Sequence, residues 1–136
     1  TDFSFKEKDD NGKLKKNRVE GGKKPLSSMA PLIIFDENKN FLMSIGSPGG
    51  KAIISYLSRI LIDYFYFKKD IGKSIKEPNY IKIFGKTFIE DEILKSKINE
   101  DVTVRSLTSG IGIILKNNDF LYGYADPRRD GTVKGN

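Results

Sequence analysis

The hydrophobic positions of this chain fall into short blocks separated by polar segments. Residues 32–36 and 41–45 form short, mostly apolar runs, and the polar residues 37–40 between them predict a β-hairpin. Alternation within both blocks is weak, so we expect both faces of these strands to be covered. Blocks at 102–104, 111–115 and 120–124 predict further strands, and the polar residues 116–119 predict a hairpin turn between the last two.

A long amphipathic helix is predicted over residues 51–68. Its apolar residues recur every three or four positions and so share one wide face: Ile53, Leu57, Ile60, Leu61, Tyr64 and Phe65. A short helix over 70–76 would end before Pro78. Three acidic residues at 90–92 favour a helix start within 88–98. Residues 6–25 are polar and contain Asn11-Gly12 and Gly21-Gly22, which indicates an irregular loop.

This order of elements is typical of an α+β layered domain. A length of 136 residues with 38% hydrophobic content suits one domain or part of a larger one. The chain begins with Thr and has no visible signal peptide, so we expect a processed product or a fragment whose targeting segment lies elsewhere. No apolar run reaches the ~18 residues that a membrane-spanning helix needs.

The charge balance and two missing residue types narrow the possible chemistry. The net charge is +6, but acidic residues flank the densest basic run, 13–18, and no aromatic residue interrupts it. We therefore interpret this run as a solvated loop and expect no nucleic-acid partner. Cysteine and histidine are both absent, which excludes thiol nucleophiles and Ser-His-Asp triads within the chain. A hydrolase would need another base, such as the α-amine of an N-terminal Thr.

The turn Gly46-Ser47-Pro48-Gly49-Gly50 lies between a predicted strand and the long helix. Glycines let a substrate carbonyl approach the backbone, and the first N–H groups of a helix can stabilise a developing oxyanion. A tight turn with glycines for geometry alone has the same spacing. A phosphate-binding loop fits less well, because the motif is one residue short and Ala52 stands where Ser or Thr should bind magnesium.

Two other polar groups could contribute to a site. Ser27 and Ser28 are adjacent hydroxyls, a pair that can hold a carboxylate, although a Ser-rich turn bonding its own backbone is the alternative. The second group follows the last predicted strand and alternates in charge. We expect ion pairs within it to fix the C-terminal loop rather than to bind substrate; its members are Asp126, Arg128, Arg129 and Asp130.

Four segments resemble signatures of the γ-glutamyltranspeptidase small subunit, an N-terminal-nucleophile hydrolase. They are Thr-Asp-Phe-Ser at 1–4, Lys-Pro-Leu-Ser-Ser-Met-Ala-Pro at 24–31, the glycine turn at 46–50, and Ala-Asp-Pro-Arg-Arg-Asp-Gly at 125–131. The resemblance implies a four-layer αββα sandwich of which this chain supplies part. Residues 1–136 would be the C-terminal portion of the small-subunit domain. Within it, 1–25 would be a substrate-site loop, and 26–136 would hold the hairpin, the long helix, the small helices and the closing strands.

The same resemblance implies roles for five residues. Gly49 and Gly50 would form the oxyanion hole, Ser27 and Ser28 would bind the glutamyl α-carboxylate, and Asp2 would face the α-ammonium group. Thr1 stands where the family usually has a first Asp. The family's nucleophilic Thr precedes a long β-rich segment that is missing here, so the resemblance implies a nucleophile outside this chain, with Thr1 as the alternative.

The implied activity is γ-glutamyl transfer from, or hydrolysis of, glutathione and related compounds through a Thr acyl-enzyme. The implied partners are the large subunit and the N-terminal part of the small subunit, released from one precursor by autoproteolysis. No cofactor or metal is implied, and the compartment would be periplasmic or extracellular. Two alternatives stay open: a related acylase that cleaves a β-lactam side chain, and a catalytically inactive fragment or binding module.

Overall fold

The computed structural model describes residues 2–135 and contains two β-sheets. The larger sheet is antiparallel throughout and has the order β1-β2-β6-β7. Its strands are β1 (Leu32–Phe35), β2 (Phe41–Gly46), β6 (Gly112–Asn117) and β7 (Phe120–Ala125). The smaller sheet has the order β3-β4-β5, with β4 and β5 parallel. Its strands are β3 (Tyr80–Ile83), β4 (Lys86–Ile89) and β5 (Val102–Val104).

Helical segments connect the two sheets. The predicted long helix is present as three consecutive pieces: the 3₁₀ turn η1 (Gly50–Ala52), α1 (Ile53–Leu61) and the π-helical turn η2 (Ile62–Tyr66). The short helix α2 (Ile71–Ser74) starts at Asp70, whose side chain accepts a hydrogen bond from Lys73 N. The 3₁₀ helix η3 (Glu92–Lys97) follows β4. No helix within residues 2–135 is long and apolar enough to span a bilayer.

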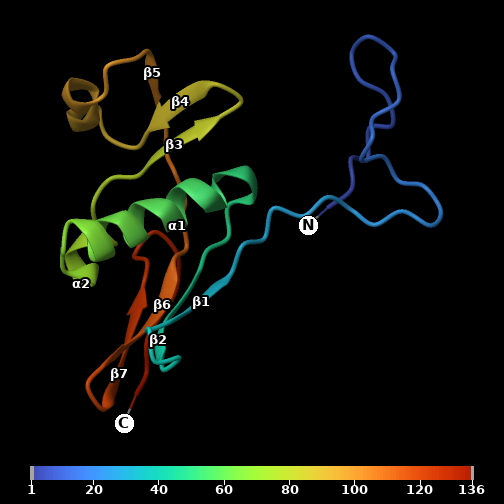
Figure 1. Cartoon of the computed structure of the whole chain (residues 1–136). Coiled ribbons are helices and arrows are strands. Elements are labelled where there is room, and N and C mark those ends of the chain that lie inside the picture. The colour runs from blue at the N-terminus through green and yellow to red at the C-terminus, as the bar shows by residue number, and fades with distance from the viewer. Residues whose placement is uncertain (1, 136) are drawn as a thin grey trace.

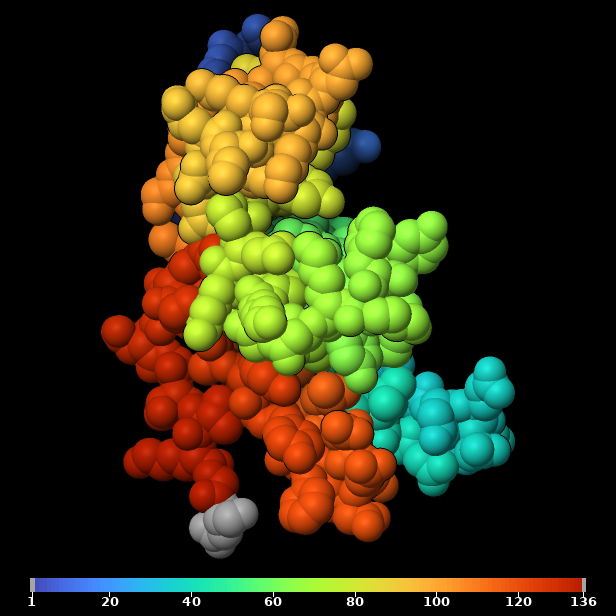
Figure 2. Space-filling view, turned by 90° about the vertical axis from the view of Figure 1, so that its left-hand side faces the viewer, coloured from blue at the N-terminus to red at the C-terminus, as the bar shows by residue number. Residues whose placement is uncertain are grey.

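The core forms around α1, which lies between the small sheet and the four-stranded sheet (Figure 1). One face of α1 packs on the larger sheet, and Ile81 of the small sheet joins the same hydrophobic cluster. Figure 2 shows the yellow and orange segment of the small sheet stacked on the green helices, with the red C-terminal segment below them. The least exposed apolar side chains of this core are Met43, Ile60, Ile71, Ile75, Ile81, Leu107 and Ile111.

The face of the larger sheet that points away from α1 has no covering layer within the described chain. We call it the open face; its residues are Ile33, Ser44, Gly46, Gly112, Ile114, Leu121, Gly123 and Ala125. A groove of about 1160 Å³ runs over it, bordered by the C-terminal segment, where Val133 packs on Gly123. The expectation that both faces of the first hairpin are covered is therefore wrong for this chain, because only the α1 side carries a second layer.

The N-terminal segment projects from the layered body, and short backbone bridges hold it together (Figure 1). These bridges join Asp2 to Leu26, Ser4 to Arg18, and Lys8 to Leu14. The irregular loop predicted for residues 6–25 is confirmed, since no helix or strand forms there. The basic side chains of this loop are largely exposed, which agrees with a solvated surface.

Candidate functional site

The glycine turn connects β2 to η1 and has a backbone that only glycine adopts readily. Gly49 has φ 136° and Gly50 has φ 56°, both in the region disfavoured by a Cβ atom. A Cβ on Gly49 would lie 2.8 Å from Cε2 of Tyr56, so the ring of α1 also excludes any larger residue. Gly49 O accepts a hydrogen bond from Ala52 N at 3.1 Å and closes the turn.

This turn directs the start of a helical segment toward solvent at the end of β2. The first N–H groups of a helix have no partners within it, and its dipole favours negative charge at that end. Gly50 has no heavy atom within 4 Å of the position a Cβ would take, so a ligand can approach its backbone. The local geometry is therefore suited to binding an oxygen that carries negative charge.

Asp2 and the Ser27-Ser28 pair come together although they are far apart in sequence. Asp2 N donates to Leu26 O at 3.2 Å, which brings Asp2 beside the residue that precedes Ser27. The Asn17 side chain binds both backbone segments of this contact: its Nδ2 donates to Asp2 O at 2.8 Å, and its Oδ1 accepts from Leu26 N at 2.8 Å. The backbone of Asp2 is thus held against that of Leu26, one residue before the serine pair.

The two serines have different surroundings. Ser27 is exposed, and its Oγ accepts a hydrogen bond from Met29 N at 3.2 Å, while Ser28 is half-buried. The Ser27 contact is the local backbone turn that sequence alone offered as the alternative. Both serines follow directly after Leu26, whose backbone pairs with that of Asp2.

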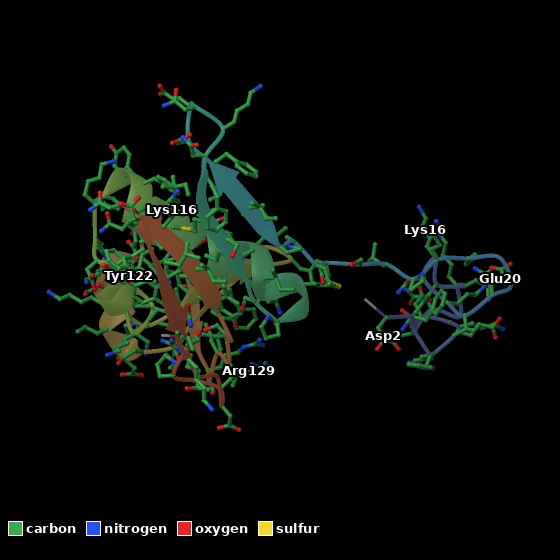
Figure 3. All side chains as sticks on the ribbon, turned by 90° about the horizontal axis from the view of Figure 1, so that it is seen from below. Asp2, Lys16, Glu20, Lys116, Tyr122 and Arg129 are labelled. Carbon is green, nitrogen blue, oxygen red and sulfur yellow. The ribbon has the colours of Figure 1, made fainter. Side chains whose placement is uncertain are left out.

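The serine pair and the glycine turn extend from the same end of the larger sheet. Leu32, at the start of β1, pairs with Ile45 near the end of β2. Ser28 precedes β1 and the glycine turn follows β2, so the antiparallel pairing places both segments beyond the same end of the sheet. Asp2 itself lies on the projecting segment, away from the sheet (Figure 3). The structure pairs Asp2 with the residue before the serines and does not bring it against the glycine turn.

Thr1, the alternative nucleophile, lies outside the described residues. Within residues 2–135 no group of three His, Cys, Asp or Glu side chains gathers where it could hold a metal ion.

The C-terminal turn is built around Asp126, which is buried at the end of β7. Its carboxylate accepts hydrogen bonds from Ser109 Oγ at 2.5 Å and from Ile111 N at 3.3 Å. Burial raises the pKa of Asp126, but the hydrogen bonds from Ser109 and Arg128 outweigh it and leave this pKa below the ordinary value of 3.8. The side chain is a fixed structural anion.

Arg128 connects this turn to the helical layer. It bonds Asp126 at 3.1 Å and Glu90 at 2.6 Å, and also donates to the carbonyls of Ile75 and Glu77. The ion pair expected within the 126–130 group is thus present between Arg128 and Asp126. Asp130 takes no part in it. These contacts agree with the structural role expected from the sequence.

The sequence did not indicate the buried polar chain that continues from Asp126 into the core. Asn79 donates to Ser109 Oγ at 2.9 Å and accepts from Arg59 Nε at 3.3 Å. Arg59 in turn bonds Asp63, which lies in the π-helical turn. Burial lowers the pKa of Arg59. Single polar residues in apolar segments were the only signal, and they do not reveal partners so distant in sequence.

Comparison with known proteins identifies the family. The sequence model of gamma-glutamyltranspeptidase matches residues 1–136. The chain is 32% identical over 131 residues to the glutathione hydrolase proenzyme of Bacillus subtilis, covering 88% of this chain and 22% of that protein. It is 29% identical over 133 residues to the capsule biosynthesis protein CapD proenzyme of Bacillus anthracis, covering 88% of this chain and 24% of that one.

The fold agrees with solved structures of the same group. The T380A mutant of Helicobacter pylori gamma-glutamyltranspeptidase superposes with a TM-score of 0.73 over 93% of this chain and 77% of that chain, at 24% identity. The α+β class and its N-terminal-nucleophile hydrolase architecture, expected from the sequence, are thereby confirmed. The chain spans about a fifth of the length of the curated relatives it matches. A match to the family over every residue means that this chain belongs to the gamma-glutamyltranspeptidase family.

Proposed function

We propose that this chain supplies part of the active site of an enzyme that transfers or hydrolyses γ-glutamyl groups, as in glutathione. Gly49 and Gly50 stabilise the oxyanion, Ser27 and Ser28 bind the α-carboxylate, and Asp2 binds the α-ammonium group. The nucleophilic Thr comes from a segment outside this chain. The isolated chain is therefore inactive.

The observation that carries this proposal is the contact between Asp2 and Leu26. The α-carbon of a glutamyl group bears a cation and an anion on neighbouring atoms. The 3.2 Å backbone bond and the Asn17 side chain hold the backbone of Asp2 against that of Leu26, the residue before the serine pair. This pairing supports a site in which one carboxylate and two hydroxyls, the complementary groups, bind the same ligand.

The proposed reaction uses a Thr from outside this chain and a substrate that reaches the glycine turn from the Asp2 segment. The Thr Oγ attacks the γ-carbonyl carbon while its proton passes to the Thr α-amine, a base that an N-terminal Thr carries itself. The carbonyl oxygen becomes an oxyanion at Gly49 and Gly50, where each N–H donor contributes about 3 kcal/mol in well-studied hydrolases. The C–N bond breaks, the leaving amine takes the proton, and water or an acceptor amine then resolves the ester.

The open face supports a further part of the proposal, namely that the remaining polypeptide of the enzyme covers this sheet. At one end of the sheet its positions are small, with Gly46, Gly112 and Ala125 in register across three strands. Small residues allow a second sheet to approach closely. The B. subtilis relative is long enough to supply such a layer, since this chain matches only 22% of it.

The test is the Asp2→Ala variant of the complete enzyme, assayed with γ-glutamyl-p-nitroanilide. We expect kcat/KM to fall by about 100-fold or more, because loss of a charge-paired ligand costs roughly 3 kcal/mol. Asp101→Ala, which removes an exposed carboxylate just before β5, is the matched control and should behave as the wild type. Equal kcat/KM for Asp2→Ala and wild type would refute the clamp.

The two alternatives are separated by the same assay. An acylase for β-lactam side chains would prefer a glutaryl anilide, which lacks the α-ammonium group that Asp2 binds. An inactive module would process neither anilide; one relative, from Arabidopsis thaliana, is described as a putative inactive glutathione hydrolase 4. Preference for the γ-glutamyl anilide supports the proposal.

A further inference from the structure

We infer that Gly110 is a positioning residue for the glycine turn 46–50, and that the C-terminal turn 126–129 holds Gly110 in place. This role rests on the proposed function, because it concerns the support of the oxyanion donors. Gly110 precedes β6 and is remote in sequence from the turn it would support.

A hydrogen bond joins Gly110 to the glycine turn. Gly110 N donates to Ser47 Oγ at 3.3 Å, and Ser47 Oγ donates to Pro48 O at 2.8 Å. The Ser47 hydroxyl thus bridges the strand-entry segment and the peptide that leads into Gly49. This link fixes the turn from the side opposite to α1, where Tyr56 packs beneath Gly49.

Close packing makes the same contact intolerant of any added atom. A Cβ on Gly110 would lie 2.5 Å from Arg129 Cδ and 2.8 Å from Pro48 Cγ. The Arg129 side chain is flexible and can move aside, whereas the Pro48 ring is rigid and belongs to the turn. Gly110 does not have the left-handed backbone conformation of Gly49 and Gly50, so an added methyl group acts through space alone.

Hydrogen bonds from the C-terminal turn hold the backbone around Gly110 in place. Ser109 Oγ donates to the buried Asp126 carboxylate at 2.5 Å, and Asp126 N donates to Ile111 O at 2.9 Å. Arg129 donates to Thr108 O at 3.0 Å. The residues on both sides of Gly110 are therefore anchored. Figure 3 shows Arg129 and Lys116 at opposite ends of the sheet. The end with Arg129 is the one where β2 leads into the glycine turn.

Such support affects the transition state more than substrate binding. Oxyanion donors act because they are held beforehand at about 2.7–3.1 Å from the developing charge. An atom that displaces Pro48 also displaces the N–H groups of Gly49 and Gly50, while the Asp2 and serine contacts stay as they are. The expected signature is a lower kcat at nearly constant KM.

The experiment is steady-state kinetics of Gly110→Ala in the complete enzyme with γ-glutamyl-p-nitroanilide. We expect kcat to fall about tenfold or more and KM to stay within about twofold. Gly135→Ala is the control, because its added Cβ has no heavy atom within 4 Å. Adding Pro48→Ala to the Gly110→Ala variant removes the ring atom in conflict and should restore kcat at least about threefold.

A kcat for Gly110→Ala within about twofold of wild type overturns the role, as does a double variant with no recovery. If Gly110→Ala does not fold, Ser47→Ala replaces it, since this variant removes the bridging hydroxyl without adding volume; an unchanged kcat then overturns the role. A wild type without γ-glutamyl turnover refutes the proposed function itself. An active wild type with an equally active Gly110→Ala refutes only the positioning role.

Discussion

At the scale of single residues, Asp126 shows how one buried carboxylate organises a loop. It accepts hydrogen bonds from a hydroxyl, two backbone N–H groups and the Arg128 guanidinium. Burying a carboxylate anion without such partners costs free energy of desolvation, whereas these hydrogen bonds stabilise the ionised form. The lowered pKa of Asp126 reflects this stabilisation of the anion, because the folded protein binds the proton of Asp126 more weakly than the unfolded chain does.

This pKa predicts a pH dependence of stability. Because the folded pKa lies below the ordinary 3.8, Asp126 stabilises the fold above that value, and the contribution disappears as pH falls through the folded pKa. Asp126→Asn cannot titrate, so its free energy of unfolding should fall less between about pH 5 and pH 2 than that of the wild type. Urea unfolding over this range measures the difference.

Asp130→Asn is the matched control for that measurement, because this exposed carboxylate of the same turn forms no ion pair within residues 2–135. Its pH profile should follow the wild type. Parallel profiles for wild type and Asp126→Asn would show that Asp126 is not held as an anion by its partners.

At the scale of elements, the Arg59 side chain fastens α1 to its neighbours. Its NH1 group donates to Ser74 O at 2.8 Å and bonds Asp63 at 3.3 Å, while Nε reaches Asn79. Removing one partner of a buried ion pair leaves the other charge uncompensated. Lys69 also contacts Asp63, at 3.1 Å, but from a more exposed position.

We therefore predict that Arg59→Ala lowers the free energy of unfolding by about 3–5 kcal/mol. Lys69→Ala should cost about 1 kcal/mol or less, because the pairs of this lysine are partly solvated. Chemical denaturation of both variants provides the comparison. Equal losses for the two would mean that burial of Arg59 does not decide its contribution.

The same elements show what a sequence can reveal. Apolar blocks and helical spacing correctly predicted both hairpins of the larger sheet, the long helix and the short helix after Asp70, because these features depend on local periodicity. Strands β3 and β4 were missed, since each is four residues long and mixes Lys or Thr with apolar positions. The π-helical turn has no local sequence signal. Its buried residue, Asp63, is bonded by Arg59, Ser74 and Lys69, and the contact with Ser74 forms only in the folded chain.

The candidate site was predictable to a different degree. Spacing alone identified a glycine turn and a serine pair, but their roles, and that of Asp2, came from the resemblance to a family. The Asn17 clamp and the Gly110 contact could not be predicted, because each joins segments whose proximity only the folded chain creates.

At the scale of the whole molecule, the open face is the sheet surface that no other layer of the described chain covers. Ile114 lies near its centre, between Ser44 and Gly123 on the neighbouring strands, and is 47% exposed. Contiguous apolar surface of this kind marks an interaction site or an aggregation liability. If the rest of the enzyme covers this face, one substitution should have opposite effects in two contexts.

We predict that Ile114→Asp reduces self-association of the isolated chain but prevents assembly of the complete enzyme. In the first context the charge faces water, and in the second it is buried without a partner, at a cost of several kcal/mol. Sedimentation velocity measures the first effect, and copurification of the subunits measures the second. Ile93→Asp, at an exposed position of η3 away from the open face, should change neither result. Normal assembly of the Ile114→Asp enzyme would contradict a covered sheet, because no packed second layer accommodates an unpaired carboxylate at its centre.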